Sequence, residues 1–311
     1  MDFVHLRCHS NFSLLEGAAT VGRLAEAAAG RGMSALALTD TNGLYAAVPF
    51  CRAARGRGLK PILGVELTGS LERSCRGARA VVLARSNRGF AEVCRLATAR
   101  SLEPGFRLAQ ALAGAAASGE VFVLTGEEDL LRSLASCLPA GGLYVELCPT
   151  GETGEAVRTR RLVELSRELG LPLAATANVH FADREDWTLH RLLRAVDLGT
   201  TLDGLKPGDT VSRSCWLAGP ADMARRLSGL PAEALANTLR IAARCSVELP
   251  AGRPIFPEVS LPPGESAYSR LLKAAFRGAC RRYRPLRAEV LERLRAELEV
   301  IDRLGFAPYF L

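Results

Sequence analysis

The chain has 311 residues, of which 48% are hydrophobic and 6% aromatic, and its formal net charge at pH 7 is +7. This composition supports a buried core and excludes a disordered or fibrous protein. No apolar run approaches the roughly 20 residues that span a bilayer, and no basic leader precedes an apolar stretch at the N-terminus. We therefore expect a cytoplasmic protein without membrane contact, built as one large α/β unit and a smaller piece.

Nine cysteines are scattered between Cys8 and Cys280 without a CxxC pair. This spacing excludes a secreted disulfide framework and a zinc ribbon, so we expect reduced, mostly buried thiols. The positive charge is carried almost wholly by arginine. A mild basic excess is compatible with nucleic-acid binding but does not demonstrate it.

Short apolar runs alternate with amphipathic segments through the first two thirds of the chain. We predict strands at Phe3–His9, Ala35–Thr39, Pro61–Leu67, Arg79–Ala84, Val121–Thr125, Leu143–Leu147 and Leu171–Thr176. We predict helices between them at Val21–Arg31, Leu44–Arg57, Phe90–Arg100 and Val157–Leu169. Such alternation is typical of a parallel sheet covered by helices. Seven strands without a GxGxxG turn after the first favour a closed barrel, whose chemistry lies at the C-terminal ends of its strands.

The pattern changes after about Leu202. A helical stretch, Leu227–Val247, is followed by five prolines that predict an extended connector: Pro250, Pro254, Pro257, Pro262 and Pro263. Two further helices are predicted at Ser266–Tyr283 and Arg287–Leu304. The basic run Arg281–Arg284 is either a solvated face or a DNA contact.

In the first predicted strand, the alternation of side chains places three polar residues on one face: His5, Arg7 and His9. Three large polar groups on a buried face are costly unless a metal, a phosphate or a counter-charge meets them. Further polar residues come at the ends of predicted strands or in the loops after them: Glu16, Asp40, Glu66, Asn178 and His180. Clustered histidines and carboxylates in such places suit divalent metals and the hydrolysis of phosphate esters.

Plainer roles compete for several of these side chains. His5 fits a structural, hydrogen-bonded histidine, and His190, within the helical stretch Trp187–Val196, fits surface or packing. Asp40 is as well suited to capping the next helix as to a site. For Glu66, at a buried strand end, a site position is favoured.

Four motifs resemble those of PHP (polymerase and histidinol phosphatase) domains. They are His5–Gly17, Leu36–Asp40, Leu59–Glu66 and Leu171–Phe181, and the likeness is strongest to the domains that open bacterial DNA polymerase III alpha subunits, the C-family polymerases. It continues through Leu235–Ala242 to Val300–Phe306. The resemblance implies an α/β fold, a PHP-type distorted (β/α)7 barrel over residues 1–255. Residues 256–311 would then be a linker and the first helices of a polymerase palm domain.

The same resemblance implies a degenerate metal site. Active members place histidine where this chain has Arg7, Thr41 and Arg79, cysteine at the position of Glu127, and aspartate at Glu16 and Asn178. The implied vestigial site comprises Arg7, His9, Glu16, Asp40, Thr41, Glu66, Arg79, Glu127, Asn178 and His180. Because an arginine cannot ligate a cation, any metal that remains would be held by His9, Glu66 and His180.

The substituted arginines suggest how the site compensates. A carboxylate cluster at one barrel mouth repels itself unless a cation lies between its members. We therefore expect a nitrogen of Arg7 or Arg79 at about 3 Å from Glu66 or Glu16.

The function that the resemblance implies is that of a DNA-directed DNA polymerase, a nucleotidyltransferase of replication or repair that uses Mg²⁺. In the family the palm carboxylates lie beyond the position of Leu311, so this chain alone is expected to have a structural or interaction role. Its partners would be the remainder of the polymerase or other polymerase III subunits, including a proofreading exonuclease, with DNA bound through the full enzyme. The alternatives are a stand-alone metal-dependent phosphoesterase or 3′–5′ exonuclease and a non-catalytic interaction module.

Overall fold

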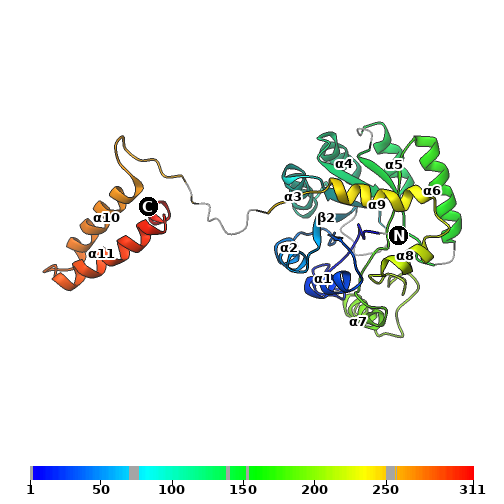
Figure 1. Ribbon diagram of the computed structural model, residues 1–311, viewed down its shortest axis with the longest axis horizontal. Coiled ribbons are helices and arrows are strands. Elements are labelled where there is room, and N and C mark those ends of the chain that lie inside the picture. The colour runs from blue at the N-terminus through cyan, green and yellow to red at the C-terminus, as the bar shows by residue number, and fades with distance from the viewer. Residues whose placement is uncertain (1–2, 70–76, 138–140, 152–153, 250–255, 257) are drawn as a thin grey trace. The chain divides into compact units, whose positions relative to one another are not determined.

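The computed structural model describes residues 3–69, 77–137, 141–151, 154–249, 256 and 258–311. The chain forms two compact units, the first ending at Leu249 and the second running to Leu311 (Figure 1). The boundary expected at 255 and the prolines Pro250, Pro254 and Pro257 of the expected connector lie outside the described residues.

Among its described residues, the first unit contains six strands that lie side by side in chain order. They are β1 (Ala35–Leu38), β2 (Lys60–Thr68), β3 (Arg79–Ala84), β4 (Val121–Thr125), β5 (Leu143–Leu147) and β6 (Leu173–Ala175), and each falls on a predicted strand. The expectation of an all-parallel sheet is wrong, because β3 runs antiparallel to both of its neighbours. Thr68 pairs directly with Arg79. The ten residues between them are too few for a crossover to a parallel strand, which takes a dozen or more.

The predicted first strand, Phe3–His9, is not a regular strand, but it closes the barrel. Only Cys8 forms an isolated bridge, to Val179. On one side the segment binds the edge of β1, where Ala37 N donates to His5 O at 3.0 Å. On the other side Val179 N, beyond β6, donates to Arg7 O at 3.0 Å, and His9 N donates to Val179 O at 2.8 Å. The segment therefore lies between the two edges of the six-stranded sheet and takes the place of the seventh strand of the predicted barrel.

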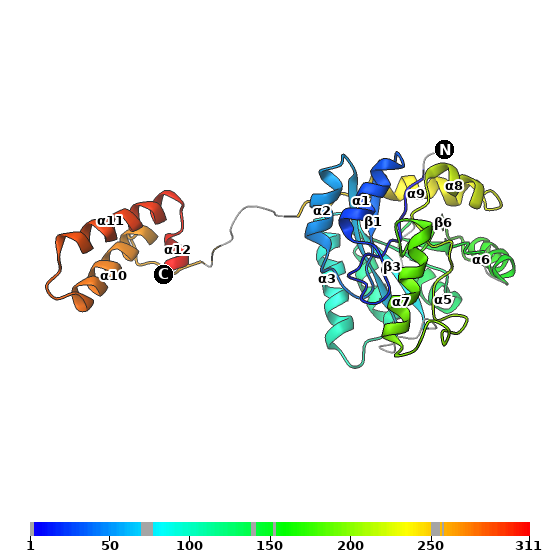
Figure 2. The same ribbon diagram turned by 90° about the horizontal axis from the view of Figure 1, so that it is seen from below.

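Helices surround the outside of the sheet (Figures 1 and 2). They are α1 (Val21–Gly30), α2 (Ala47–Arg55), α3 (Asn87–Leu102), α4 (Leu108–Ala117), α5 (Glu128–Ala135) and α6 (Glu155–Leu169). A short 3₁₀ turn, Arg184–Asp186, then leads into α7 (Trp187–Asp197), α8 (Pro220–Arg226) and α9 (Ala232–Arg244). The single helix expected over Leu227–Val247 is shorter, because Pro231 stands at the N-cap of α9.

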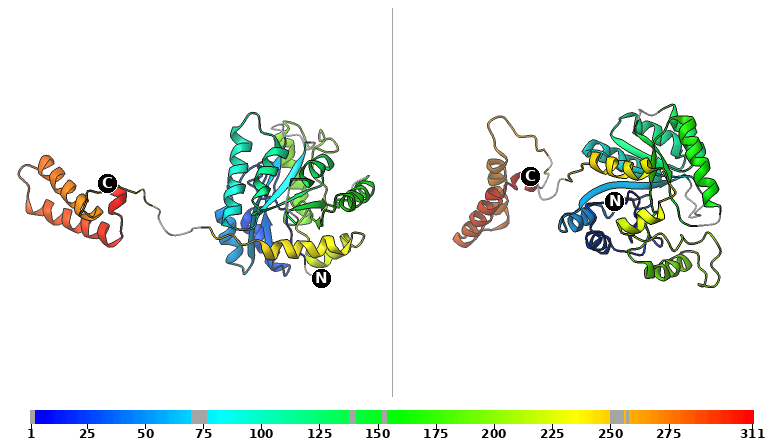
Figure 3. Two further views of the ribbon diagram at one scale, coloured as in Figure 1. Left: turned by 90° about the horizontal axis from the view of Figure 1, so that it is seen from above. Right: turned by 45° about the vertical axis from the view of Figure 1, so that its right-hand side comes forward.

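Two apolar layers hold the barrel together. The outer layer packs the sheet against the helices, whereas the inner layer fills the barrel with side chains such as Leu6, Ile62, Leu83 and Phe122. Helix α9 contributes Ile241 to this inner layer and crosses one end of the barrel (Figure 3). The apolar filling leaves polar side chains to occupy the opposite end, which the parallel strands reach with their carboxyl ends.

The second unit is a small helical assembly. It consists of α10 (Ala267–Arg282), α11 (Ala288–Arg303) and the short α12 (Ala307–Phe310). Its buried core is limited to Leu271, Leu298 and Ala307, with partly buried side chains around them. Among the described residues of both units, no helix is long and apolar enough to cross a membrane.

Candidate functional site

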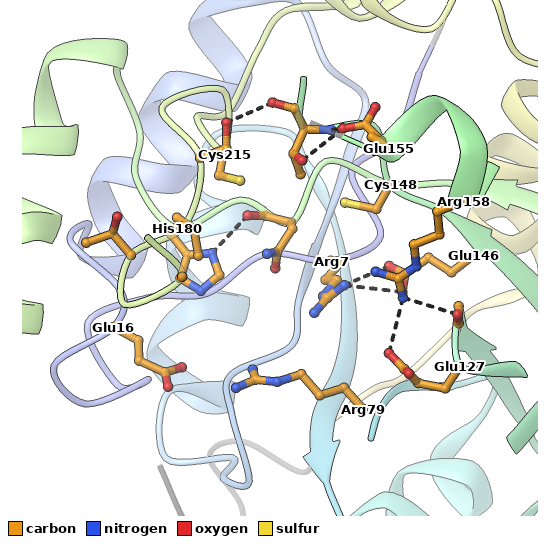
Figure 4. Close-up of a pocket in the computed structure, with 18 of the residues that line it drawn as sticks. Arg7, Glu16, Arg79, Glu127, Glu146, Cys148, Glu155, Arg158, His180 and Cys215 are labelled. Atoms are coloured by element: carbon orange, nitrogen blue, oxygen red, sulfur yellow. Dashed lines mark hydrogen bonds and ion pairs between the residues drawn. The ribbon is translucent and has the colours of Figure 1, made fainter. Parts of the chain in front are cut away.

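A pocket of about 540 Å³ opens at the polar end of the barrel (Figure 4). The loops after β4, β5 and β6 line it, together with the start of β3 and the segment around residue 210. Its ionisable lining residues include Arg7, Glu16, Arg79, Glu127, Glu146, Glu155, Arg158, His180, His190 and Arg194. Six of the ten residues of the predicted vestigial site line this pocket: Arg7, Glu16, Arg79, Glu127, Asn178 and His180. Thr41 binds the lining residue Glu16, and Glu66 binds Arg7 and Arg79.

Glu66 is the centre of the charge network. Its side chain is fully buried, and Arg7 Nε donates to its Oε2 at 2.6 Å while Arg79 Nη1 donates to its Oε1 at 2.6 Å. His9 Nε2 lies 3.1 Å from Oε2, but without the geometry of a hydrogen bond. The expected guanidinium contact is confirmed, and both arginines make it with the same carboxylate.

Arg79 reaches the site because its strand is reversed. In an all-parallel barrel the first residue of β3 would lie at the opposite end, away from the other strand ends. The antiparallel pairing instead sets Arg79 opposite Thr68, two residues beyond Glu66. Figure 4 shows the side chains of Arg79 and Glu16 pointing toward one another in the pocket.

Glu146 is a site residue that the sequence reasoning missed. Arg7 Nη1 donates to both of its carboxylate oxygens at 3.2 Å, and Thr176 Oγ1 donates to Oε1 at 2.6 Å. The available signal was a single charge within the buried strand Leu143–Leu147. A carboxylate in such a run needs a buried counter-charge, and Arg7 supplies it.

The ionisation of Arg7 and Glu66 is set by their burial beside opposite charges. Burial opposes the charge of Arg7, but Glu146 and Glu66 more than offset it, so the pKa of Arg7 lies well above its usual range. Burial also opposes ionisation of Glu66, yet Arg7, His9 and Arg79 together hold the pKa of Glu66 well below its usual range. Burial opposes the charge of Arg79 as well, but Glu66 and Glu16 raise its pKa, so Arg7, Arg79 and Glu66 are all charged at neutral pH.

The four histidines have different surroundings: His9 and His180 lie together near Glu66, whereas His5 and His190 bind backbone groups. His180 donates through Nδ1 to Asn178 O at 2.8 Å, and its ring stacks on His9 with centroids 4.2 Å apart. Burial, followed by the nearby His9 and His190, lowers the pKa of His180 well below its usual value. His180 is thus neutral and is held in one tautomer by its backbone partner.

His5 and His190 have structural partners. His5 Nε2 donates to Ala218 O at 2.8 Å, so His5 does not face Glu66 with Arg7 and His9 as strict alternation predicted. The irregular backbone of the closing segment breaks that alternation. His190 uses both ring nitrogens, donating to Glu16 O at 2.7 Å and accepting from Val211 N at 3.1 Å.

Asp40 neither caps a helix nor contacts the arginines. It accepts hydrogen bonds from Ser10 N at 2.6 Å and from the hydroxyls of Ser10 and Ser13 at 2.8 Å each, and the N-cap of α2 is Ala46. Its carboxylate therefore fixes the loop that follows the closing segment. Thr41 lies beside this loop.

The remaining predicted positions lie nearer the rim. Thr41 Oγ1 donates to Glu16 Oε2 at 3.0 Å. Glu127 forms an exposed ion pair of 3.2 Å with Arg158, apart from the Glu66 network. Asn178 adopts a left-handed backbone with φ of 47°, and its buried Oδ1 has no hydrogen-bond partner among the described residues.

These residues do not fit the metal centre that the fold family implies. Both oxygens of Glu66 already accept from arginines, and each guanidinium lies where a cation would have to approach. An arginine has no lone pair to offer a metal, and a threonine hydroxyl is a poor replacement for imidazole. Within the described part of the chain, no three histidine, cysteine or acidic side chains gather as a metal site.

Comparison with known proteins shows which family the chain resembles. Residues 5–150 match the PHP domain family, and the whole chain is 35% identical to the error-prone DNA polymerase of Symbiobacterium thermophilum, covering 31% of that protein. Over its whole length the chain corresponds to the PHP-domain region of DNA polymerase III alpha-type proteins.

Other relatives of this PHP region cover it to the same extent. The DNA polymerase III subunit alpha of Pseudomonas aeruginosa is 33% identical over 100% of the chain, and that of Escherichia coli K12 is 32% identical over 99%. The match takes up 29% of each of these proteins. This PHP region thus spans about three tenths of the length of its curated relatives. A solved amidohydrolase from Chromobacterium violaceum is 17% identical with a TM-score of 0.40, covering 57% of this chain and 87% of that one.

Proposed function

We propose that this PHP region is a structural and docking module of a DNA polymerase of the III alpha type, in which two arginines have replaced the metals of the barrel. The observation that supports it most strongly is the binding of Arg7 and Arg79 to the two oxygens of Glu66 at 2.6 Å each. Burying the side chains of Glu66 and Glu146 is costly without a counter-charge, and the guanidiniums provide that charge permanently.

This replacement removes the chemistry that a metal site would supply. A metal-bound water becomes a nucleophile because the ion lowers its pKa, whereas a guanidinium already engaged with carboxylates does not bind and activate water in that way. What remains is a charge network that ties the closing segment to β2, β3 and β5. This network stabilises the closed barrel.

In the proposal, DNA synthesis belongs to the parts of the enzyme that this chain does not match. Polymerisation needs carboxylates that hold Mg²⁺ for in-line phosphoryl transfer. The second unit would be the start of the palm, and the barrel surface would dock the remainder of the polymerase or a proofreading exonuclease. DNA would be bound through the full enzyme.

Primer extension and hydrolysis assays test the proposal together. The chain is given a primed template, Mg²⁺ and four deoxynucleotides, and separately a 3′-labelled strand or a phosphate monoester with Mg²⁺, Mn²⁺ or Zn²⁺. We expect neither extension nor hydrolysis above a sample without protein. Template-dependent extension would overturn the assignment of synthesis to other parts of the enzyme.

The rival is a metal-dependent phosphoesterase or 3′–5′ exonuclease, and the stacking of His9 on His180 beside Glu66 is the observation that favours it. In that case metal-stimulated hydrolysis would appear in the same assay and disappear in a His9→Ala variant. Arg23→Ala, on the outer surface of the barrel, provides the matched control.

A further inference from the structure

Helix α10 and the turn that follows it concentrate positive charge. Residues 266–288 contain seven arginines and lysines and no aspartate or glutamate. Two of the seven, Arg270 and Lys273, lie near Glu265 at 3.9 and 2.6 Å. The other five form the group that we call the arginine turn: Arg277, Arg281, Arg282, Arg284 and Arg287. All five are exposed, and none has an ion pair or side-chain hydrogen bond among the described residues.

The first two members continue a stripe along α10. Counted from Arg270, the cations Lys273, Arg277 and Arg281 follow at three, seven and eleven residues, which places all four on one face of the helix. The buried Leu271 and partly buried Phe276 pack into the small core of the unit instead. Arg282 is the last residue of α10, and Arg284 and Arg287 follow beyond its end.

Helix stability does not fully account for this arrangement. Arg281 and Arg282 lie in the last turn of α10, where cations interact favourably with the helix dipole. However, Arg287 is the N-cap of α11, makes no capping hydrogen bond and lies at the positive end of that helix. Arg277 and Arg281 are four residues apart, a spacing at which like charges repel. The helix dipole therefore favours the cations at the end of α10 but opposes Arg287 at the start of α11, so helix stability explains only part of this charge.

An aromatic side chain lies within the same segment. Tyr283 stands between Arg282 and Arg284, and 47% of its surface is exposed. A positively charged path with an aromatic ring that can stack on a base is the combination that binds single-stranded nucleic acid. An acidic protein partner would make use of the guanidiniums but has no base to stack on this ring.

We propose that the arginine turn binds single-stranded DNA, with the guanidiniums on successive phosphates and Tyr283 against a base. The inference rests on the proposed function, because it takes DNA as the nucleic acid that such an enzyme handles. It assigns DNA contact to the second unit, apart from the charge network of the barrel. Guanidiniums suit this role because they stay charged and bind phosphate oxygens in pairs.

Fluorescence anisotropy of a labelled dT20 strand with the full 311-residue chain tests the inference. The logarithm of the association constant should fall with the logarithm of salt concentration with a slope of about −0.7 per phosphate contact, or about −3.5 for five contacts. The variant R277Q/R281Q/R282Q should reduce the slope to about −1.4 and weaken binding in 50 mM salt at least about tenfold. Circular dichroism shows whether the helices of each variant remain folded.

A control variant with the same change in net charge is R52Q/R88Q/R160Q, which alters three exposed arginines scattered over the barrel. It should bind dT20 within about twofold of the parent, since these residues form no continuous path. Y283A should weaken dT20 binding by about fivefold or more and leave duplex binding unchanged. Equal losses in the two triple variants would overturn the inference, as would duplex binding that depends on Tyr283 to the same degree.

Absence of dT20 binding, or binding that survives R277Q/R281Q/R282Q, would also overturn the inference. Neither result bears on the structural role proposed for the barrel, because its tests change residues of the barrel alone. Conversely, metal-dependent hydrolysis lost in His9→Ala would overturn the proposed function and leave the DNA measurement standing.

Discussion

The arginines of the two units differ in their exposure and in their ion pairs. In the barrel, Arg7 and Arg79 are largely buried, with 12% and 18% of their side chains exposed, and each donates to Glu66. In the second unit, the arginine turn is exposed and meets no carboxylate among the described residues. Residue type alone therefore does not decide what a cation does. Burial and the charge of its neighbours do.

The difference separates stability from binding. A buried guanidinium cannot be removed without leaving its carboxylate charged and unpaired, which is costly. An exposed guanidinium without a partner contributes little to folding but remains free to bind an anion. The following changes test how far this contrast holds.

The largest effect is expected for Arg7→Ala. It leaves Glu66 with one arginine fewer and removes the guanidinium that contacts Glu146, so the barrel should lose about 3–5 kcal/mol of unfolding free energy. Both tryptophans, Trp187 and Trp216, lie in the barrel. Urea unfolding followed by tryptophan fluorescence therefore reports on this unit.

Arg23→Ala is the control for Arg7→Ala. Arg23 is 51% exposed and pairs with Asp183 and Glu26 on the surface, so its removal should cost at most about 1 kcal/mol. Equal midpoints for parent and Arg7→Ala would mean that the buried network does not hold the barrel.

A second effect should appear on acidification, and it arises from His5. Burial, the largest cause, lowers the pKa of His5 from 6.5 to about 4. The folded state favours the neutral form of His5. The stability that this preference contributes is therefore fully present above pH 6.5 and is lost as the pH falls from 6.5 toward 4. A difference of this size corresponds to about 3 kcal/mol, since each pKa unit is 1.36 kcal/mol.

Urea unfolding of the barrel at pH 7.5, 6, 5 and 4 measures this loss. His5→Gln retains an N–H donor for Ala218 O but does not titrate, so its stability should fall less steeply over the same range. His180 and His190 also have lowered pKa values, chiefly through burial, and they add to the loss in both proteins. Parallel pH profiles for parent and variant would show that His5 is not the source.

A smaller contrast concerns local opening. In the described part of the second unit three core residues are buried, whereas strands β2 and β3 of the barrel are buried almost throughout. Amides of Leu294 and Leu298 should therefore exchange at least about tenfold faster than those of Leu63 and Val82, a difference of about 1.4 kcal/mol or more. Native-state hydrogen exchange measures this directly. Equal protection would show that the helical unit is as stable as the barrel.

The smallest effect is expected in the arginine turn. Arg282→Gln should change the unfolding free energy of the second unit by no more than about 0.5 kcal/mol, because the side chain is exposed and unpaired. Circular dichroism on heating, with the barrel contribution followed separately by tryptophan fluorescence, provides the measurement. A loss comparable to that of Arg7→Ala would remove the distinction between the two groups of arginines.

Sequence patterns predicted the strands well because each is a short apolar run bounded by polar residues, and β3 to β5 have the predicted limits. Strand direction was not predictable from composition, and it decided that Arg79 reaches the pocket. The pairing of Arg7 with Glu66 could be anticipated from charge balance. The contacts of Arg7 with Glu146 and of Asp40 with Ser10 could not be anticipated. The first pair is 139 positions apart in the sequence and the second pair is 30 positions apart, and only the fold brings the partners together.

The metal content of the purified chain tests the replacement of metals by arginines most directly. The protein is incubated with Zn²⁺, Mn²⁺ or Fe²⁺, passed through gel filtration and analysed by inductively coupled plasma mass spectrometry, alongside Arg7→His and His9→Ala. We expect less than about a tenth of an equivalent in the parent and in Arg7→His, because Arg79 and Thr41 still replace ligands. About one equivalent in the parent, lost in His9→Ala, would contradict the replacement of the metals by arginines.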